Sequence, residues 1–368
     1  MITKDVVSKD YLGRRVGSIS QVGGLRHYRL SGGLSDGVEA VDVRTGAGLC
    51  YTVLPGRGMD IAWADFKGLP VSYISRTGVV SANHYDPRGM EWLKGFFAGL
   101  LTTCGLSNVG WPGSDTDKVI GERHYGLHDR ISCIPAEQLS LFEDWTDDRH
   151  YRMKVRGLMR EATVHAENLT LTREISSDLG ENRIRIDDVV SNIGYDDSPL
   201  MILYHVNLGF PLLAADSVLL TTAARVVPGT PEAEREKDDY GRFTEPCHGY
   251  GERLYHHELD RRPGVLASAG LVNDRLGYGL AVSFSAEELP QLTEWKVMKE
   301  TEYVVGIEPA NTKAVGRAKA RAEGTLDTLK PGESRRFTLF LDVLDGPDAI
   351  AAFRTHVASA AGRPAGAA

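Results

Sequence analysis

The chain has 368 residues, 42% of them hydrophobic and 25% charged, with a formal net charge of −8. This balance is typical of a soluble globular protein that can bury a sizeable core. The acidic excess disfavours a general nucleic-acid binder, which needs a basic face to displace counterions. No apolar run approaches the ~18 residues that a membrane helix needs, and no signal peptide is visible, so we expect neither a nucleic acid nor a membrane as a partner.

Four cysteines are scattered along the chain and form no C-x-x-C pair: Cys50, Cys104, Cys133 and Cys247. Their spacing does not match a zinc site, and in so long a chain it is typical of reduced core residues in a cytoplasmic protein. His124 and His128 are four residues apart, but Gly126 lies between them and the surrounding pattern is not helical. We therefore expect no metal ion and no other cofactor.

The first clear strands are predicted at 48–75, where short alternating runs are separated by turn residues. Within them, "GRGMD" places Arg57 between two glycines and before Asp60. Two interpretations stay open. One is a turn with a local Arg–Asp pair, and the other is a guanidinium that binds a ligand which the glycines allow to approach.

Residues 86–104 carry apolar side chains at helical spacing, which predicts a helix, although three glycines weaken the pattern. Directly after it, "CGLSNVGWPG" carries Asn108 and Trp111 among glycines and a proline. An aromatic ring beside an amide suits the apolar face and hydroxyl rim of a sugar. An ordinary packed loop has the same composition, so both interpretations stay open.

The clearest β-hairpin covers 169–194, with one face exposed to water. A strongly apolar strand follows at 201–213, in which His205 and Asn207 share a face. A lone histidine in a strand is usually a hydrogen-bonded core residue. Two polar side chains on one buried face need several partners, which a cavity facing a polyol would supply. The His-rich segment 245–261 fits no metal motif and is interpreted as a solvated loop.

Glu308 stands at the end of an apolar strand and is followed by Pro309, which restricts the backbone. The surrounding segment adds polar and aromatic side chains, namely Trp295, Lys296, Asn311 and Arg317. The cluster fits either a strand end ringed by ion pairs or a carboxylate held in a pocket to take a proton.

A last long strand is predicted at 333–344, followed by a helix at 346–361. Strands and helices do not alternate in a βαβ rhythm, and no change of composition marks a domain boundary. The predicted fold class is therefore mainly β, as one large antiparallel β-sandwich over 1–368 with a few short helices. Residues 1–20 and 360–368 are expected to be peripheral or flexible.

Five short stretches together resemble one known family: "GRGMDI", "TCGLSNVG", "YGLHDRIS", "YHVNLGFPLL" and "GIEPANTKAVGR". They run from Gly56 to Arg317, and they make the chain similar to the galactose mutarotase-like, or aldose 1-epimerase, superfamily, and more narrowly to its DUF4432 branch. The resemblance implies a β-supersandwich and a cofactor-free isomerase whose partner is a small carbohydrate. A homodimer is left open.

The resemblance also implies roles for single residues. His205 matches the catalytic histidine of an "H-x-N-L" strand, and Glu308 matches the catalytic glutamate before a proline or a small residue. His128 matches a substrate-positioning histidine, although Asp129 replaces the glycine that follows it in the family.

Two family features have no clear match in this chain. For the early arginine, Arg57 and Asn108 are only candidates. The sugar-gripping aspartate has no equivalent, and segment 245–261 takes its place.

Mutarotation needs one proton removed from the anomeric hydroxyl and one delivered to the ring oxygen. Glu308 is predicted as the base and protonated His205 as the acid, with their roles exchanged at ring closure. The side chains expected to bind the sugar are Arg57, Asn108, His128, Asn207, Trp295, Lys296, Asn311 and Arg317, with Trp295 or Trp111 stacking on its apolar face.

Two other functions stay open. One is lyase or other chemistry on a modified or acidic sugar, with Tyr204 or Tyr125 as the base, and its unsaturated product would absorb ultraviolet light. The other is a carbohydrate-binding module in which His205 and Glu308 only hold the ligand. Such a module would bind sugar without speeding anomer exchange.

Overall fold

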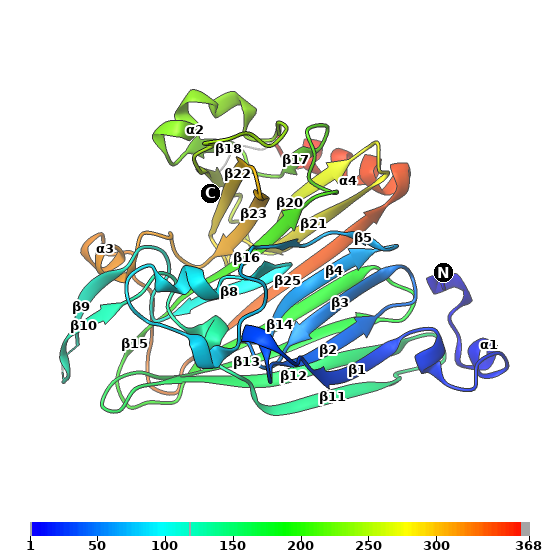
Figure 1. The fold of residues 1–368 in the computed structure, drawn as a ribbon, viewed down its shortest axis with the longest axis horizontal. Helices are drawn as coiled ribbons and strands as arrows, with labels where there is room; N and C mark the ends of the chain where they lie inside the picture. Colours follow the sequence, from blue (N-terminus) through cyan, green and yellow to red (C-terminus); the bar gives the residue numbers. More distant parts are fainter. Residues whose placement is uncertain (1, 118, 362–368) are drawn as a thin grey trace.

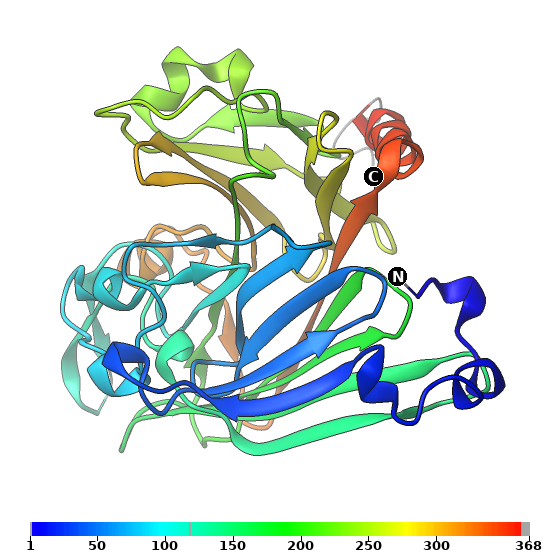
Figure 2. The ribbon, with the colours of Figure 1, turned by 45° about the vertical axis from the view of Figure 1, so that its right-hand side comes forward.

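The computed structural model describes residues 2–117 and 119–361 and consists of two large antiparallel β-sheets packed face to face (Figures 1 and 2). The larger sheet has eleven strands in the order β1-β2-β3-β4-β8-β16-β23-β22-β19-β18, with β5 paired to β4. Its strands are β1 (Gly24–Arg29), β2 (Glu39–Arg44), β3 (Leu49–Leu54), β4 (Asp60–Phe66), β5 (Leu69–Pro70), β8 (Leu101–Leu106), β16 (Met201–Gly209), β18 (Arg225–Pro228), β19 (Arg253–Glu258), β22 (Gln291–Lys299) and β23 (Glu302–Ala310).

The smaller sheet has eight strands in the order β11-β12-β13-β14-β25-β21-β20-β17. These are β11 (Glu137–Trp145), β12 (Tyr151–Ala162), β13 (Asn168–Asp178), β14 (Arg183–Asn192), β17 (Val218–Thr221), β20 (Leu266–Asn273), β21 (Tyr278–Ser285) and β25 (Ser334–Asp345). Apolar side chains from both sheets meet in the main core between them. The predicted antiparallel β-sandwich is therefore confirmed.

Short elements complete the chain. Three two-stranded pairs are β6 (Tyr73–Ile74) with β7 (Ala98–Gly99), β9 (Gly113–Asp117) with β10 (Gly121–Tyr125), and β15 (Ser198–Pro199) with β24 (Thr328–Leu329). The α-helices are α1 (Lys9–Gly13), α2 (Pro231–Arg235), α3 (Arg317–Ala322) and α4 (Gly346–Ala361). The 3-10 turns are η1 (Lys4–Val6), η2 (Ile19–Gln21), η3 (Gly33–Ser35), η4 (Ala82–His84), η5 (Glu91–Gly95), η6 (Ile131–Cys133) and η7 (Lys237–Asp239).

Most of the elements predicted from the sequence are present. The hairpin at 169–194 is β13 paired with β14, the last strand is β25, and the C-terminal helix is α4. The helix predicted at 86–104 is wrong, because that segment forms only η5 and then enters β7 and β8. Ala98 and Gly99 both have positive φ angles of 63° and 69°, which a right-handed helix cannot contain.

The two faces of β16 have different surroundings. The strand lies inside the larger sheet between β8 and β23. One face points into the main core through Ile202, Tyr204, Val206 and Leu208. The opposite face carries His205 and Asn207, and beside them Met201 and Leu203 join a smaller apolar cluster formed with the covering loops. Polar side chains on that second face therefore lie beneath loops rather than between the sheets.

The N-terminal segment, with η1, α1 and η2, lies at the opposite end of the molecule from α3 (Figure 1). Of the tail predicted to be flexible, residues 362–368 lie outside the described residues. None of the described helices combines the length and the apolar character needed to cross a membrane.

Candidate active site

A cavity of about 480 Å³ lies on the outward face of the larger sheet and brings distant parts of the chain together. Four of the residues selected from the sequence line it, namely His128, His205, Trp295 and Glu308. Trp111, considered for stacking, also lines it and is largely exposed. The spatial convergence on which the sequence-based hypothesis depends is therefore present.

The floor of the cavity is a row of polar side chains on four neighbouring strands. Glu308 on β23 is in register with Thr293 on β22, and Thr293 is in register with His256 on β19. His205 on β16 lies at the other side of Glu308, because the pairs Leu203–Ala310 and Val206–Ile307 bracket it. The strand pairing thus builds the row His205–Glu308–Thr293–His256 across the sheet.

His205 and Glu308 form a close buried pair. The Nε2 atom of His205 lies 3.0 Å from Oε1 of Glu308, and the two side chains are only 7% and 6% exposed. The distance is short, but Oε1 of Glu308 has no hydrogen-bond partner. The two strands therefore hold the side chains in contact, while Oε1 of Glu308 stays available to bind another group.

Burial decides which partner carries the proton. Burial raises the pKa of Glu308 to about 8, and the charge of Glu252 adds to this rise. Burial lowers the pKa of His205 to about 4, and the nearby side-chain amide of Asn207 opposes part of this shift. At neutral pH the pair therefore holds one proton, which rests on Glu308. The sequence-based expectation of a protonated His205 used the unperturbed pKa of ~6.5, and desolvation of the imidazolium corrects it.

Gly306 makes the contact of the pair sterically possible. A Cβ atom at this position would lie 2.8 Å from Oε1 of Glu308 and 3.2 Å from Cε1 of His205. A glycine inside a strand often marks such a close approach. Gly306 in the "YVVGIE" strand pattern could therefore have indicated a close contact at this position, which was not predicted.

His128 enters the cavity from the turn after β10 in a left-handed conformation, with φ 54°. Its backbone N–H donates to the carbonyl of Gly110, and its carbonyl accepts from the N–H of Gly105. The N–H of Gly110 also donates to Nδ1 of the ring at 3.3 Å. Because Nδ1 accepts, the proton of the neutral ring belongs on Nε2. Burial lowers the pKa of His128 to about 3, so it is a neutral donor at the cavity wall.

Aromatic rings form the wall around the pair. Trp92 stacks on Phe96 with centroids 4.6 Å apart, and Phe96 lies 5.2 Å from the ring of His205. Trp295 also packs against His205, with centroids 5.2 Å apart, and its indole N–H donates to Glu252. Sequence reasoning missed Trp92 and Phe96 as site residues, because it assigned their segment to a helix.

Arg57 does not reach the cavity, contrary to its selection as a sugar-binding residue. Its guanidinium is buried and donates to the backbone carbonyls of Ser132, Val80 and Gly95. These hydrogen bonds from one guanidinium hold three separate loops together. Its placement is that of a structural arginine.

Asn207 and Lys296 are also absent from the described lining of the cavity. Asn207 supports His205 from the side: its amide donates to the carbonyls of Ala98 and His205, while its Oδ1 and the His205 Nδ1 both lack partners. Lys296 lies on the face of β22 opposite to Trp295, and its ammonium donates to the carbonyls of Asp239 and Arg242. Alternation along the strand explains why two neighbours in sequence have separate surroundings.

Asn108, Asn311 and Arg317 fix the loop 311–317, which covers one side of the cavity. Asn311 exchanges hydrogen bonds with the backbone at Ile202 and Leu200, at the start of β16. At the other end, the N–H of Arg317 donates to Oδ1 of Asn108 at 2.7 Å.

The amide nitrogen of Asn108 donates to the carbonyls of Gly110, Trp111 and Gly126. These three residues flank the backbone that holds His128. Asn108 therefore positions the site without lining this cavity.

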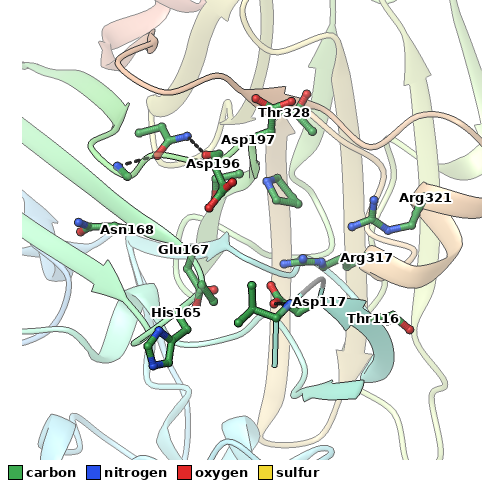
Figure 3. Close-up of a pocket in the computed structure, with 16 residues that line it drawn as sticks. Thr116, Asp117, His165, Glu167, Asn168, Asp196, Asp197, Arg317, Arg321 and Thr328 are labelled. Atoms are coloured by element: carbon green, nitrogen blue, oxygen red, sulfur yellow. Dashed lines mark hydrogen bonds between the residues drawn. The ribbon is translucent and has the colours of Figure 1, made fainter. Parts of the chain in front are cut away.

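The side chain of Arg317 points elsewhere. It bonds to Asp115 at 2.7 Å and lines a second cavity, of about 320 Å³, together with Arg321 and several acidic side chains (Figure 3). The expected contact of Arg317 with a sugar at Glu308 does not fit this position.

Two further expectations are corrected by the structure. Tyr204, considered as the base of a lyase, faces the main core and donates to Asp188 at 2.7 Å. Tyr125 is likewise absent from the described lining. Segment 245–261 is not only a solvated loop: it contains β19, with Tyr255 buried, and it presents Glu252 and His256 to the cavity. Within the described residues, no three His, Cys, Asp or Glu side chains cluster as a metal site.

Comparison with known proteins gives the family and the fold. The model of the family described as "Domain of unknown function (DUF4432)" matches residues 35–343. No curated protein matches the chain.

Among solved structures, a protein from Klebsiella pneumoniae proposed to be an aldose 1-epimerase has a TM-score of 0.84 at 24% identity, covering 97% of this chain and 91% of its own. A galactose mutarotase-like protein from Clostridium acetobutylicum has a TM-score of 0.58 at 12% identity, covering 88% and 99%. The galactose 1-epimerase of Lactobacillus acidophilus has a TM-score of 0.55 at 14% identity, also covering 88% and 99%. The chain belongs to the DUF4432 family and has the galactose mutarotase-like fold.

Proposed function

We propose that this protein is an isomerase that interconverts the anomers of a sugar by acid/base catalysis, with Glu308 and His205 as the two proton-transferring groups. The observation that carries the proposal is the 3.0 Å contact between Nε2 of His205 and Oε1 of Glu308 at the wall of a cavity. A buried imidazole beside a buried carboxyl, both with unpaired polar atoms, is an unusual arrangement in a packed core.

The reaction needs two proton transfers and no other bond-making group. Removal of the proton on the anomeric hydroxyl and protonation of the ring oxygen break the bond between C1 and the ring oxygen. Rotation about C1–C2 presents the other face of the aldehyde, and the reverse transfers close the ring as the other anomer. A base and an acid that share one proton supply both steps, because each returns to its starting form at the end of the cycle.

The protonation of the pair fits one stage of this cycle. Protonated Glu308 and neutral His205 are the forms that exist once the base has taken the hydroxyl proton and the acid has delivered its own. This is the state of the pair with open-chain sugar. For the pair to receive a closed ring, the bound substrate has to align Oε1 of Glu308 with Nε2 of His205, 3.0 Å away, so that the proton passes between them. Hydroxyl groups that donate to the carboxylate favour this shift, since they replace lost solvation.

The remaining walls suit a sugar. Trp295 and the stacked pair of Trp92 and Phe96 offer apolar ring faces beside His205. Neutral His128 offers an N–H from Nε2 toward the same space. A pyranose has both an apolar face and a polar rim, so rings and donors on adjoining walls match it.

Glu308→Gln tests the proposal. The substitution keeps the shape of the side chain and removes its proton transfer, so anomer exchange measured by magnetisation-transfer NMR on a panel of aldoses is expected to fall roughly 10²–10⁴-fold. The free energy of unfolding is expected to change by less than about 1 kcal/mol, because the buried side chain is already uncharged at neutral pH. The matched control is Glu287→Gln at an exposed position, which is expected to keep full activity.

Full exchange activity in folded Glu308→Gln would remove Glu308 from the mechanism. Sugar binding without any acceleration of anomer exchange in the unmodified protein would replace the proposal with a carbohydrate-binding role. An ultraviolet-absorbing product would replace it with lyase chemistry.

A further inference from the structure

The charged groups around the cavity come from several separate elements of the fold. Its described lining contains two carboxylates, Glu308 and Glu252. Glu308 lies beside His205, and Glu252, just before β19, accepts the indole N–H of Trp295 at 3.1 Å and acts through its charge on Glu308. The described ammonium groups of the lining, Lys313 and Lys319, come from loop 311–317 and from α3.

Lys313 lies near the far end of the row. Burial lowers the pKa of His256, and the charge of Lys313 is the next largest cause of that shift. His256 is the last member of the row, two strands away from Glu308. An ammonium close to His256 is therefore displaced from the catalytic pair by about two strand spacings, roughly 10 Å, which exceeds the span of a pyranose ring and leaves room for an anionic group at its far end.

Lys313 has no acidic partner among the described residues, although the chain has an excess of acidic over basic residues. Lys319 has a single loose ion pair, with Glu323 at 3.8 Å, and its side chain is 62% exposed. The loop that carries Lys313 is nonetheless tied at both ends, by Asn311 to β16 and through Arg317 to Asn108. A fixed loop that presents an unpaired cation to a cavity is preorganised for an anion.

We propose that Lys313, assisted by Lys319 and His256, forms an anion subsite, and that the substrate is an aldose carrying a carboxylate or a phosphate at the end remote from its anomeric carbon. This proposal rests on the proposed function and adds the class of substrate to it. Arg57 and Arg317, which were expected to bind the sugar, do not contribute to this subsite, because both are bonded elsewhere.

The experiment compares three sugars with the same ring: D-glucose, D-glucuronate and D-glucose 6-phosphate. Anomer exchange is measured by magnetisation-transfer NMR with the full chain, and binding by saturation-transfer difference NMR with Glu308→Gln. The variants are Lys313→Gln and Lys319→Gln, and the control is Lys9→Gln on α1, which removes the same charge at the other end of the molecule.

We expect kcat/KM to be higher for at least one of the two anionic sugars than for glucose. The preference is the kcat/KM for the anionic sugar divided by the kcat/KM for glucose. Lys313→Gln should lower this preference roughly three- to tenfold, Lys319→Gln should lower it less, and Lys9→Gln should leave it unchanged. The preference should also fall as salt is raised from 0.05 to ~0.5 M, because ions screen a partly exposed contact. Preference for glucuronate alone or for the phosphate alone identifies which anion the subsite takes.

The other possible results contradict the anion subsite, the proposed function, or both. Exchange on glucose equal to that on both anions, or a ratio unaffected by Lys313→Gln, overturns the subsite and leaves the proposed function standing. Preferential binding of an anionic sugar that Lys313→Gln removes, without anomer exchange in the unmodified protein, keeps the subsite and overturns the proposed function. Absence of both binding and exchange with all three sugars overturns both.

Discussion

Two buried polar clusters lie on opposite faces of β16, attached to neighbouring residues. On the inner face, Tyr204 meets Arg173, whose guanidinium lies 2.6 Å from Asp188 and 3.3 Å from Asp60, with both arginine–aspartate contacts fully buried. On the outer face, His205 meets Glu308. The same strand thus supports an ion-pair network between the sheets and an imidazole–carboxyl pair under the loops.

The two clusters differ in the hydrogen bonding of their polar atoms and in the access of a substrate to them. Every nitrogen of the Arg173 guanidinium donates a hydrogen bond, to Asp188, Thr103 or the backbone near Asp60. In the outer cluster, His205 Nδ1 and Glu308 Oε1 have no hydrogen-bond partner. Oδ2 of Asp60 in the inner cluster also lacks a partner, but it is sealed between the sheets, whereas the unpaired atoms of the outer cluster lie beside a cavity where a substrate can reach them.

The largest expected effect comes from breaking the inner cluster. Asp188→Ala leaves the Arg173 charge buried with its main partner removed, and the free energy of unfolding is expected to fall by about 3–5 kcal/mol. The control Asp342→Ala breaks the partly exposed pair with Arg183 at the surface and should cost about 1 kcal/mol or less. Denaturant unfolding measures both. Equal losses in the two variants would contradict the assignment of the inner cluster to stability.

The next effect comes from crowding the outer cluster. Gly306→Ala places a methyl group against Glu308 and His205, and the displaced pair should lose roughly 10–100-fold in kcat for anomer exchange. The loss of stability should be smaller than in Asp188→Ala. Gly17→Ala, where the added carbon meets nothing within 4 Å, is the control. Unchanged kcat in Gly306→Ala would mean that the contact of the pair is not needed.

The proton shared by the outer pair predicts a bell-shaped pH profile. Below the His205 pKa of about 4 both groups are protonated and no base remains, while above the Glu308 pKa of about 8 both are deprotonated and no acid remains. The value of kcat/KM should therefore be flat between these limits and fall about tenfold per pH unit outside them. A profile that rises steadily with pH through 8 would contradict a catalytic proton on Glu308.

The smallest effect concerns the support of His205. The side-chain amide of Asn207, close to the His205 ring, raises the pKa of His205 against the larger effect of burial. Asn207→Leu removes this contribution, so the acid limb of the profile should move to lower pH while the alkaline limb stays in place. The pH dependence of kcat/KM in the variant measures the shift. Movement of both limbs together would mean that Asn207 acts through the structure of the cavity as a whole.

Local sequence patterns were sufficient for much of the fold. Alternation predicted β13, β14 and β25, and the apolar spacing of 346–361 predicted α4, because each pattern reflects the nearest neighbours of a single element. The same reasoning failed at 86–104, where three glycines outweighed an apolar spacing that resembles a helix. Of the two interpretations kept for Asn108, the structure supports the ordinary packed loop, whereas the role of Asn311 in fixing a loop was not anticipated.

The sequence by itself determined which side chains of β16 and β23 share a face, since alternation along a strand places His205 with Asn207 and Glu308 with Gly306. Only the tertiary structure decided that β16 and β23 are neighbours, and that the loop carrying Lys313 closes over the same cavity. Pairing between strands a hundred residues apart depends on the packing of the whole sheet, which no local pattern encodes. Burial follows from that packing, and burial is the reason that the shared proton rests on Glu308 and not on His205.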